Sequence, residues 1–223
     1  MIKFVEPLPR AFPGRFGGIV LSAALLASTP ALATNHTTNH DKVGVYSYAE
    51  ITYQRLSYER TGSSNRVAHG GGVSGSWEFA RNLYAFGGYN QLRDGGSNNS
   101  LDLRDGHVGT GFAYPITPRL DLFAEASLLY TDTERCIDGD CIEFDTTGYG
   151  LGLGAWIALS PGGGIRLSWT EREFDDSAGD AFRTSSRVIE FGLHSRYSGH
   201  GVVLGGQQRD NGSSFRIGYR YTF

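Results

Sequence analysis

Beyond its N-terminal segment, the chain has no run of about 18 consecutive apolar residues, so the sequence predicts no transmembrane helix. Apolar residues also lack helical spacing, and the 32 glycines recur too often for long helices to be stable. Basic residues form no stripe, and the formal net charge of the whole chain is −3. These absences exclude a helical membrane protein and argue against a nucleic-acid partner, which would require positive charge opposite its phosphates.

The first 33 residues have the pattern of a cleavable signal peptide. Basic residues near the start precede a mostly apolar stretch at 16–26. Ala31 and Ala33 supply the small residues that a signal peptidase requires, so we expect cleavage after Ala33; the alternative is a retained anchor helix. Removal of residues 1–33 takes away three positive charges and one negative charge, which changes the formal net charge to −5. Residues 34–42 are then a flexible polar lead to a folded domain at 43–223.

That domain alternates apolar and polar residues in segments of about ten residues. At positions 148–159, glycines occupy one face of the predicted strand, while Tyr149, Leu151 and Leu153 occupy the other. A row of glycines on one face is expected inside a narrow barrel, where side chains from opposite walls need room. With 13% aromatic residues, the composition is typical of a sheet with lipid on one side and a polar interior on the other.

The alternation predicts an all-β fold: a transmembrane, antiparallel, up-and-down β-barrel of about ten strands. We place them at 43–56, 66–78, 83–93, 102–114, 120–131, 143–159, 164–174, 184–197, 202–209 and 213–223. Eight strands remain an alternative if 202–209 is not a strand. Short turns at 80–82, 116–119, 160–163 and 198–201 are expected on the periplasmic side, and longer polar loops at 59–65, 93–101, 132–142 and 175–183 outside the cell.

Aromatic residues gather where the strands should cross the two membrane interfaces. One group is expected near the short turns and another toward the long loops, because Trp and Tyr favour the level of the lipid headgroups. Trp156 fits this scheme least, since it shares the glycine face that we assign to the interior. The alternative is a soluble sandwich with core aromatics. The first group is Trp77, Phe79, Tyr114, Trp156 and Tyr197, and the second is Tyr130, Tyr149 and Trp169.

The C-terminal strand ends on Phe223, with alternate residues from Phe215 onward pointing one way. Arg216, Gly218, Tyr221 and Phe223 match the signal by which bacterial outer-membrane barrels are recognised for assembly, so this end resembles that signal. The stretches Leu83–Gly88 and Gly109–Ala124 extend the likeness. The chain resembles small Gram-negative outer-membrane barrels of the OmpA-like and OmpX/Ail-like kind, and looks closest to those of xanthomonads.

The resemblance implies an integral protein of the cell outer membrane with roles in adhesion, envelope integrity or host interaction. Its implied partners are outer-membrane lipid and lipopolysaccharide, the barrel assembly machinery, and a surface or host ligand at the loops. No cofactor, metal site or catalytic residue is carried over by the resemblance.

Charged and histidine side chains on the polar faces of strands are predicted to lie in the lumen. Inside a narrow barrel these groups must pair, because an unpaired buried charge is unfavourable. An ion-pair network that fills the lumen is the first interpretation, and a polar pore lined by the same groups is the alternative. The lumen residues are Glu50, His107, Glu125, Arg166, Glu190, His194, Arg196, Arg216 and Arg220.

The two cysteines, Cys136 and Cys141, are expected to form a local disulfide in the loop at 132–142, as two nearby cysteines do in an oxidising compartment. Acidic residues surround them, but their spacing departs from that of an EF-hand loop. A solvated acidic loop is favoured over loosely held Mg²⁺ or Ca²⁺ that bridges to lipopolysaccharide phosphates. The acidic residues are Asp132, Glu134, Asp138, Asp140, Glu143 and Asp145.

Three function classes remain open from the sequence. The first is a non-enzymatic surface barrel that acts through its loops, and the second is a narrow diffusion channel. The third, an outer-membrane enzyme acting on lipid or peptide, is disfavoured because no residue merits a catalytic role. His194 and Ser195, for example, are adjacent in a strand and face opposite sides. His107 could meet Glu125, or His69 could approach Ser74, but a histidine beside a carboxylate in a strand is more often a structural pair.

Overall fold

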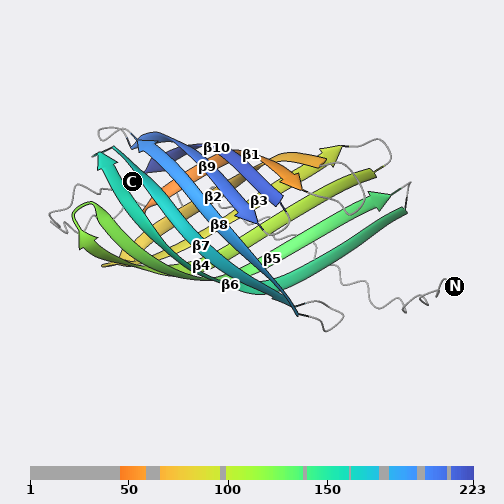
Figure 1. The fold of residues 1–223 in the computed structure, drawn as a ribbon, viewed down its shortest axis with the longest axis horizontal. Helices are drawn as coiled ribbons and strands as arrows, with labels where there is room; N and C mark the ends of the chain where they lie inside the picture. Colours follow the sequence, from red (N-terminus) through yellow and green to blue (C-terminus); the bar gives the residue numbers. More distant parts are fainter. Residues whose placement is uncertain are drawn as a thin grey trace. The chain divides into compact units, whose positions relative to one another are not determined.

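The computed structural model describes residues 46–58, 66–95, 99–137, 140–160, 162–175, 181–194, 199–209 and 212–223. The predicted signal peptide and polar lead, at 1–42, lie outside these residues. The described strands form one closed antiparallel barrel of ten (Figure 1). The all-β barrel is therefore confirmed, with ten strands rather than eight. The described residues contain no helix that is long and apolar enough to cross a membrane.

Each strand pairs with its neighbours in the chain, and β1 closes the barrel by pairing with β10. In that closing pair, Tyr48 lies opposite Thr222 and Tyr58 opposite Gly212. The strands are β1 Tyr48–Tyr58, β2 Arg66–Ala80, β3 Leu83–Gly95, β4 Asn99–Thr117, β5 Leu120–Ile137, β6 Asp140–Ser160, β7 Gly163–Asp175, β8 Ala181–His194, β9 His200–Arg209 and β10 Gly212–Thr222.

The connections divide between two ends of the barrel. We call the end with the β2–β3, β4–β5, β6–β7 and β8–β9 connections the turn end, and the opposite end the hairpin end. In the β2–β3 turn, Asn82 has a φ of 68°, a left-handed conformation that asparagine tolerates. Its N–H donates to Oε1 of Glu78 at 3.2 Å. Figure 1 shows that β5 and β6 reach farther at the hairpin end than β9 and β10.

Strict alternation separates the outer surface of the barrel from its interior. Leu151 and Leu153 of β6 are 58% and 59% exposed, whereas Gly150 and Gly152 between them are buried. The same pattern places Phe215, Ile217, Tyr219, Tyr221 and Phe223 on the outer face at the C-terminal end. Because each large apolar side chain is more stable out of water by about 1.5–3 kcal/mol, a lipid environment suits this surface. The predicted faces of these two segments are confirmed.

The aromatic residues follow the alternation, which corrects one prediction. Trp156 is 5% exposed and points inward, so its predicted place at the lipid interface is wrong. It has the same parity as Gly152 and Gly154, and its ring lies 2.5 Å from where a Cβ at Gly164 would be. Tyr197 lies outside the described residues. The other predicted interface aromatics face outward: Trp77, Phe79, Tyr114, Tyr130, Tyr149 and Trp169.

Apolar side chains form two small clusters inside the barrel. Leu56, Ala68 and Leu92 pack together toward the hairpin end. Toward the turn end, Tyr84 packs with Ala113 and Phe123. Charged residues lie around the second cluster, and they form the candidate site described next.

Candidate functional site

Ion pairs join β1, β8 and β10 within the half of the lumen next to the turn end. Glu190 is 2% exposed and lies between two arginines. It accepts from Nη2 of Arg220 at 2.6 Å and from Nη2 of Arg216. Arg220 also donates from Nε to Glu50 at 2.7 Å, and its guanidinium lies 4.0 Å from the ring of Tyr48. Two carboxylates thus neutralise two guanidinium groups that alternation turns away from lipid.

A second group of contacts joins β7, β5 and β3. Nη2 of Arg166 lies 2.6 Å from Oε1 of Glu125, across the intervening strand β6. The same oxygen accepts a hydrogen bond from the Tyr84 hydroxyl at 2.7 Å. The Arg166 guanidinium stacks 4.3 Å from the ring of Phe123, a favourable cation–π distance. The side chains of Tyr84, Glu125 and Arg166 therefore point away from the barrel wall and contact one another inside the lumen.

Tyr46, immediately before β1, connects opposite walls of the barrel. Its hydroxyl donates to Oδ2 of Asp121 on β5 at 3.4 Å, and its ring stacks on Tyr84 with centroids 4.7 Å apart. Ser76 fixes this segment by donating to the Tyr46 carbonyl at 2.8 Å. We name the combined set the lumen plug: Tyr46, Glu50, Tyr84, Asp121, Glu125, Arg166, Glu190, Arg216 and Arg220.

Sequence reasoning identified six of the seven charged members of the plug but missed Asp121, and it also missed Tyr46 and Tyr84. The signal for Asp121 was present, because it shares a face with Phe123 and Glu125. Tyr46 had no comparable signal, since alternation cannot show that a side chain crosses the lumen. The six that were predicted are Glu50, Glu125, Arg166, Glu190, Arg216 and Arg220.

The remaining predicted lumen residues have different outcomes. His107 is partly buried on an inward position of β4, with its ring 6.0 Å from that of Phe86. It makes no ion pair within the part of the chain that the structure describes. The side chain of His194 and all of Arg196 lie outside the described residues.

The predicted loop at 132–142 is wrong in its secondary structure. Most of it belongs to β5 and β6, which remain paired through Ile137 and Asp140. The backbone ladder continues because polar side chains are compatible with a strand on both faces once it has left the lipid. The predicted loops at 93–101 and 175–183 are likewise shortened, because strand residues extend to Gly95 and Asp175.

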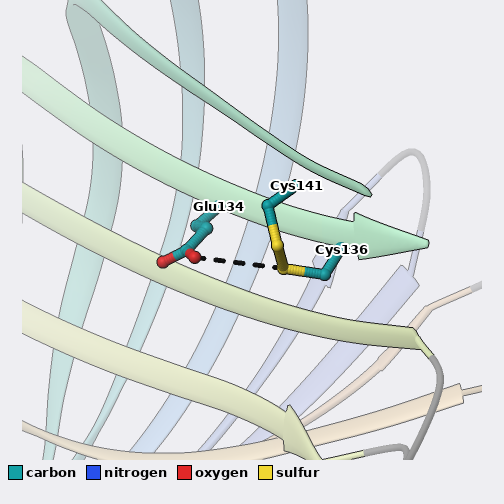
Figure 2. Close-up of side chains that lie close together, drawn as sticks. All are labelled: Glu134, Cys136 and Cys141. Atoms are coloured by element: carbon teal, nitrogen blue, oxygen red, sulfur yellow. Dashed lines mark hydrogen bonds between the residues drawn. A yellow bond between two sulfur atoms is a disulfide. The ribbon is translucent and has the colours of Figure 1, made fainter. Parts of the chain in front are cut away.

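Cys136 and Cys141 lie directly opposite each other near the tip of this hairpin and form a disulfide, with Cα atoms 4.0 Å apart. Figure 2 shows Glu134 beside it, with Oε1 3.9 Å from Sγ of Cys136. The two sulfurs and the carboxylate are close enough to be metal ligands. Metal binding at sulfur requires thiolates, however, so the disulfide-bonded form is not a thiolate metal centre.

Two like-charged pairs lie on the same hairpin, farther from its tip than the disulfide. Asp132 is opposite Asp145, and Glu134 is opposite Glu143. Like charges directly across a ladder are destabilising. Arg104 on β4 offsets one of them, with Nη1 3.0 Å from Oδ2 of Asp132.

The same outer cluster holds Asp102 at 2.9 Å from Nε of Arg93 and 3.4 Å from Nη2 of Arg104. Partial burial alone favours the neutral carboxyl, but hydrogen bonds from Gln91 and Arg93 and the two positive charges outweigh it. The pKa of Asp102 is therefore below its usual range. A lowered folded-state pKa stabilises the fold above the unfolded pKa, and this contribution is lost as the pH falls through the folded value.

Replacement of Asp102 by Asn is expected to lower the free energy of unfolding at pH 7 by about 0.5–1 kcal/mol, because both arginines are partly exposed. The difference from the unchanged protein should begin to shrink as the pH falls below about 4 and should disappear below the lowered folded-state pKa. Chemical unfolding at several pH values measures it. The exposed Asp175, changed to Asn, is the control; a pH-independent difference for Asp102→Asn would contradict the ionic explanation.

A cavity of about 330 Å³ lies at the hairpin-end half of the wall. Most of its lining faces outward, so it is a depression of the outer wall rather than part of the lumen. Its lining residues are Tyr149, Leu151, Glu171, Arg172, Glu173, Thr184 and Ser185.

A closed sheet with an apolar outer surface and paired charges inside defines a membrane-spanning β-barrel. The chain matches the family described as outer membrane protein beta-barrel domain over residues 19–223, and it belongs to that family. It is accordingly a protein of the outer membrane. The predicted family and localisation at this level are confirmed.

Solved structures of bacterial outer-membrane proteins are similar to it. The β domain of the Bordetella autotransporter BrkA has 15% identity and a TM-score of 0.51, with 79% of this chain and 99% of that chain covered. Ail, the attachment invasion locus protein of Yersinia pestis, has 15% identity, a TM-score of 0.43 and coverages of 78% and 99%. An outer membrane channel from Pseudomonas putida F1 has 9% identity and a TM-score of 0.48, with 81% of this chain and 96% of that chain covered. The comparison with curated proteins gave no match.

Proposed function

We propose that this protein is a non-enzymatic surface barrel that does not conduct ions and acts through its hairpin end in adhesion, envelope stability or contact with a host. The lumen plug is the observation that carries the proposal. Arg166 and Arg220 are paired with carboxylates at 2.6–2.7 Å, and Tyr46, two residues before β1, reaches Asp121 on β5. In a narrow barrel, such a layer leaves little room for a continuous water path.

In this proposal the hairpin end faces the outside of the cell and the turn end faces the periplasm. The outer face contacts lipid, and the charged hairpins contact lipopolysaccharide and the surface or host ligand. The assembly machinery recognises the C-terminal strand through Arg216, Gly218, Tyr221 and Phe223. The two inward arginines of that strand then complete the plug when β10 pairs with β1.

The described histidine contacts support a non-enzymatic role. His69 bonds to the Tyr53 hydroxyl at 3.0 Å, and His200 bonds to that of Tyr219. Both pairs are exposed on the outer face, where tyrosine and histidine form stacked pairs rather than a nucleophile with its base. Lipid A mass spectra from cells with and without the protein test the enzymatic alternative.

The protein from Thr34 to Phe223, refolded into a planar bilayer, is expected to insert without producing current steps. A double variant that removes one pair of the plug, Arg166→Ala with Glu125→Ala, is expected to give discrete openings. The matched control removes an ion pair outside the lumen, Arg104→Ala with Asp132→Ala, and should stay silent. Reproducible steps from the unchanged protein would favour the narrow diffusion channel instead.

A further inference from the structure

The interior toward the hairpin end holds two arginines that the plug does not use, Arg172 on β7 and Arg209 on β9. Both occupy inward positions, because Arg172 has the parity of Arg166 and Arg209 that of the buried Val203. The Nε atoms of both are shielded from solvent, and neither Nε has a hydrogen-bond partner among the residues that the structure describes. The guanidinium of Arg209 donates from Nη2 to Oε1 of Gln207 at 3.4 Å, a neutral partner that leaves its charge unpaired. Buried polar atoms without partners are rare in folded proteins and call for an explanation.

The charges around these arginines do not balance. Arg172 is repelled by Arg209 and attracted by Asp105. The carboxylate of Asp105 already accepts a hydrogen bond from Thr131 at 3.0 Å. In the plug, by contrast, Arg166 and Arg220 each contact a carboxylate at 2.6 Å. Among the residues that the structure describes, the lumen at the hairpin end is therefore short of negative charge.

A buried hydroxyl lies on the strand between the two arginines. Ser186 on β8 is 3% exposed, and its Oγ also has no partner in the described part of the chain. It is opposite Arg209 in the β8–β9 pair and opposite Thr170 in the β7–β8 pair. Arg172 is two residues along from Thr170, so it is a diagonal neighbour of Ser186, about 7–8 Å away between Cα atoms.

The neighbouring strand β6 contributes no side chain beside this group. Gly150 of β6 is opposite Arg172, and Gly152 is opposite Thr170. Neither glycine carries a side chain into the lumen. Long guanidinium groups from β7 and β9 can therefore converge on a small ligand without displacing a side chain of β6.

We propose that Arg172, Arg209 and Ser186 form a binding site for a small tetrahedral oxyanion, phosphate or sulfate, inside the barrel at the hairpin end. The planar guanidinium groups suit two-point contact with such an anion, and the Ser186 hydroxyl supplies a further donor. The ligand enters from the hairpin end, because the plug occupies the half of the lumen next to the turn end. The site depends on these three side chains and not on whether the plug conducts.

Calorimetric titration of inorganic phosphate, sulfate and chloride into the folded protein in detergent micelles tests this proposal. Phosphate or sulfate is expected to bind, and chloride much less. Arg172→Gln and Arg209→Gln should each weaken binding by about tenfold or more, since each removes a charge-assisted contact. Ser186→Ala should weaken it less. The matched control is Arg187→Gln, which removes the same charge from an exposed, outward position next to Ser186.

Thermal unfolding gives a second measurement that does not depend on detectable heats. At matched ionic strength, phosphate should raise the melting temperature of the unchanged protein and of Arg187→Gln above its value in chloride, but not that of Arg172→Gln. No phosphate binding and no phosphate-specific shift in the unchanged protein would overturn the proposal. Equal binding of chloride, or equal loss in Arg187→Gln, would also overturn it, because either result indicates only a diffuse positive field.

Discussion

Replacement of Glu190 by Gln is expected to lower the free energy of unfolding by about 3–5 kcal/mol, the usual effect of breaking a buried ion pair from one side. Glu190 is almost completely buried and accepts from both Arg216 and Arg220. An amide of the same shape cannot neutralise either guanidinium, so two cations remain inside the barrel with only Glu50 for compensation. Equilibrium unfolding in micelles, followed by tryptophan fluorescence and by mobility on an unboiled gel, measures the loss.

The same substitution at Glu171, exposed on the neighbouring strand β7, is the matched control. It removes an equal charge at the surface and should change the free energy of unfolding by no more than about 0.5 kcal/mol. Equal losses at the two positions would show that net charge, rather than the buried network, determines stability. An unchanged stability in Glu190→Gln would show that the plug is dispensable for the fold.

Alternation predicted most of the architecture, because a strand has a side-chain period of two and one face must meet lipid. On β6 it assigned the glycines to the interior and Leu151 and Leu153 to the outside. On β10 it assigned Arg216 and Arg220 to the interior. Face assignment is a local property of the sequence, so it does not require knowledge of the strand's neighbours.

The partners of the inward residues could not be predicted in the same way. Arg166 meets Glu125 across β6, and Arg220 meets Glu190 across β9. These contacts depend on strand tilt and on the stagger between strands, which a single sequence does not specify. Tyr46 is a further case, because its hydroxyl reaches Asp121 on β5, a strand that does not pair with β1.

The error at 132–142 has a physical cause. Sequence reasoning treated a run of acidic residues as a loop, whereas β5 and β6 continue as a paired hairpin beyond their apolar segments. Outside the lipid, both faces of a hairpin are wet, so apolar alternation ends before the hydrogen-bond ladder does. The opposed Cys136 and Cys141 were a signal for this pairing, since a disulfide across a short connection suits two facing strand positions.

Gly154 tests how tightly the wall packs on the plug. A Cβ at this position would lie 2.3 Å from Cζ of Phe123 and 2.4 Å from the carbonyl oxygen of Leu167. The carbonyl belongs to the backbone of β7 and cannot move without disturbing its pairing. The ring of Phe123 also contacts the guanidinium of Arg166, 4.3 Å from its centroid. Gly154→Ala is therefore expected to lower the free energy of unfolding by about 1–3 kcal/mol, as overpacking of a filled interior does.

Gly206→Ala is the matched control, because a Cβ there would meet no atom within 4 Å and the position faces outward. It should leave stability unchanged or raise it by up to about 1 kcal/mol through reduced freedom of the unfolded chain. Chemical unfolding of both variants in the same micelles separates the two effects. If Gly154→Ala is as stable as Gly206→Ala, the interior is loosely packed at this level, and the case for a closed lumen weakens with it.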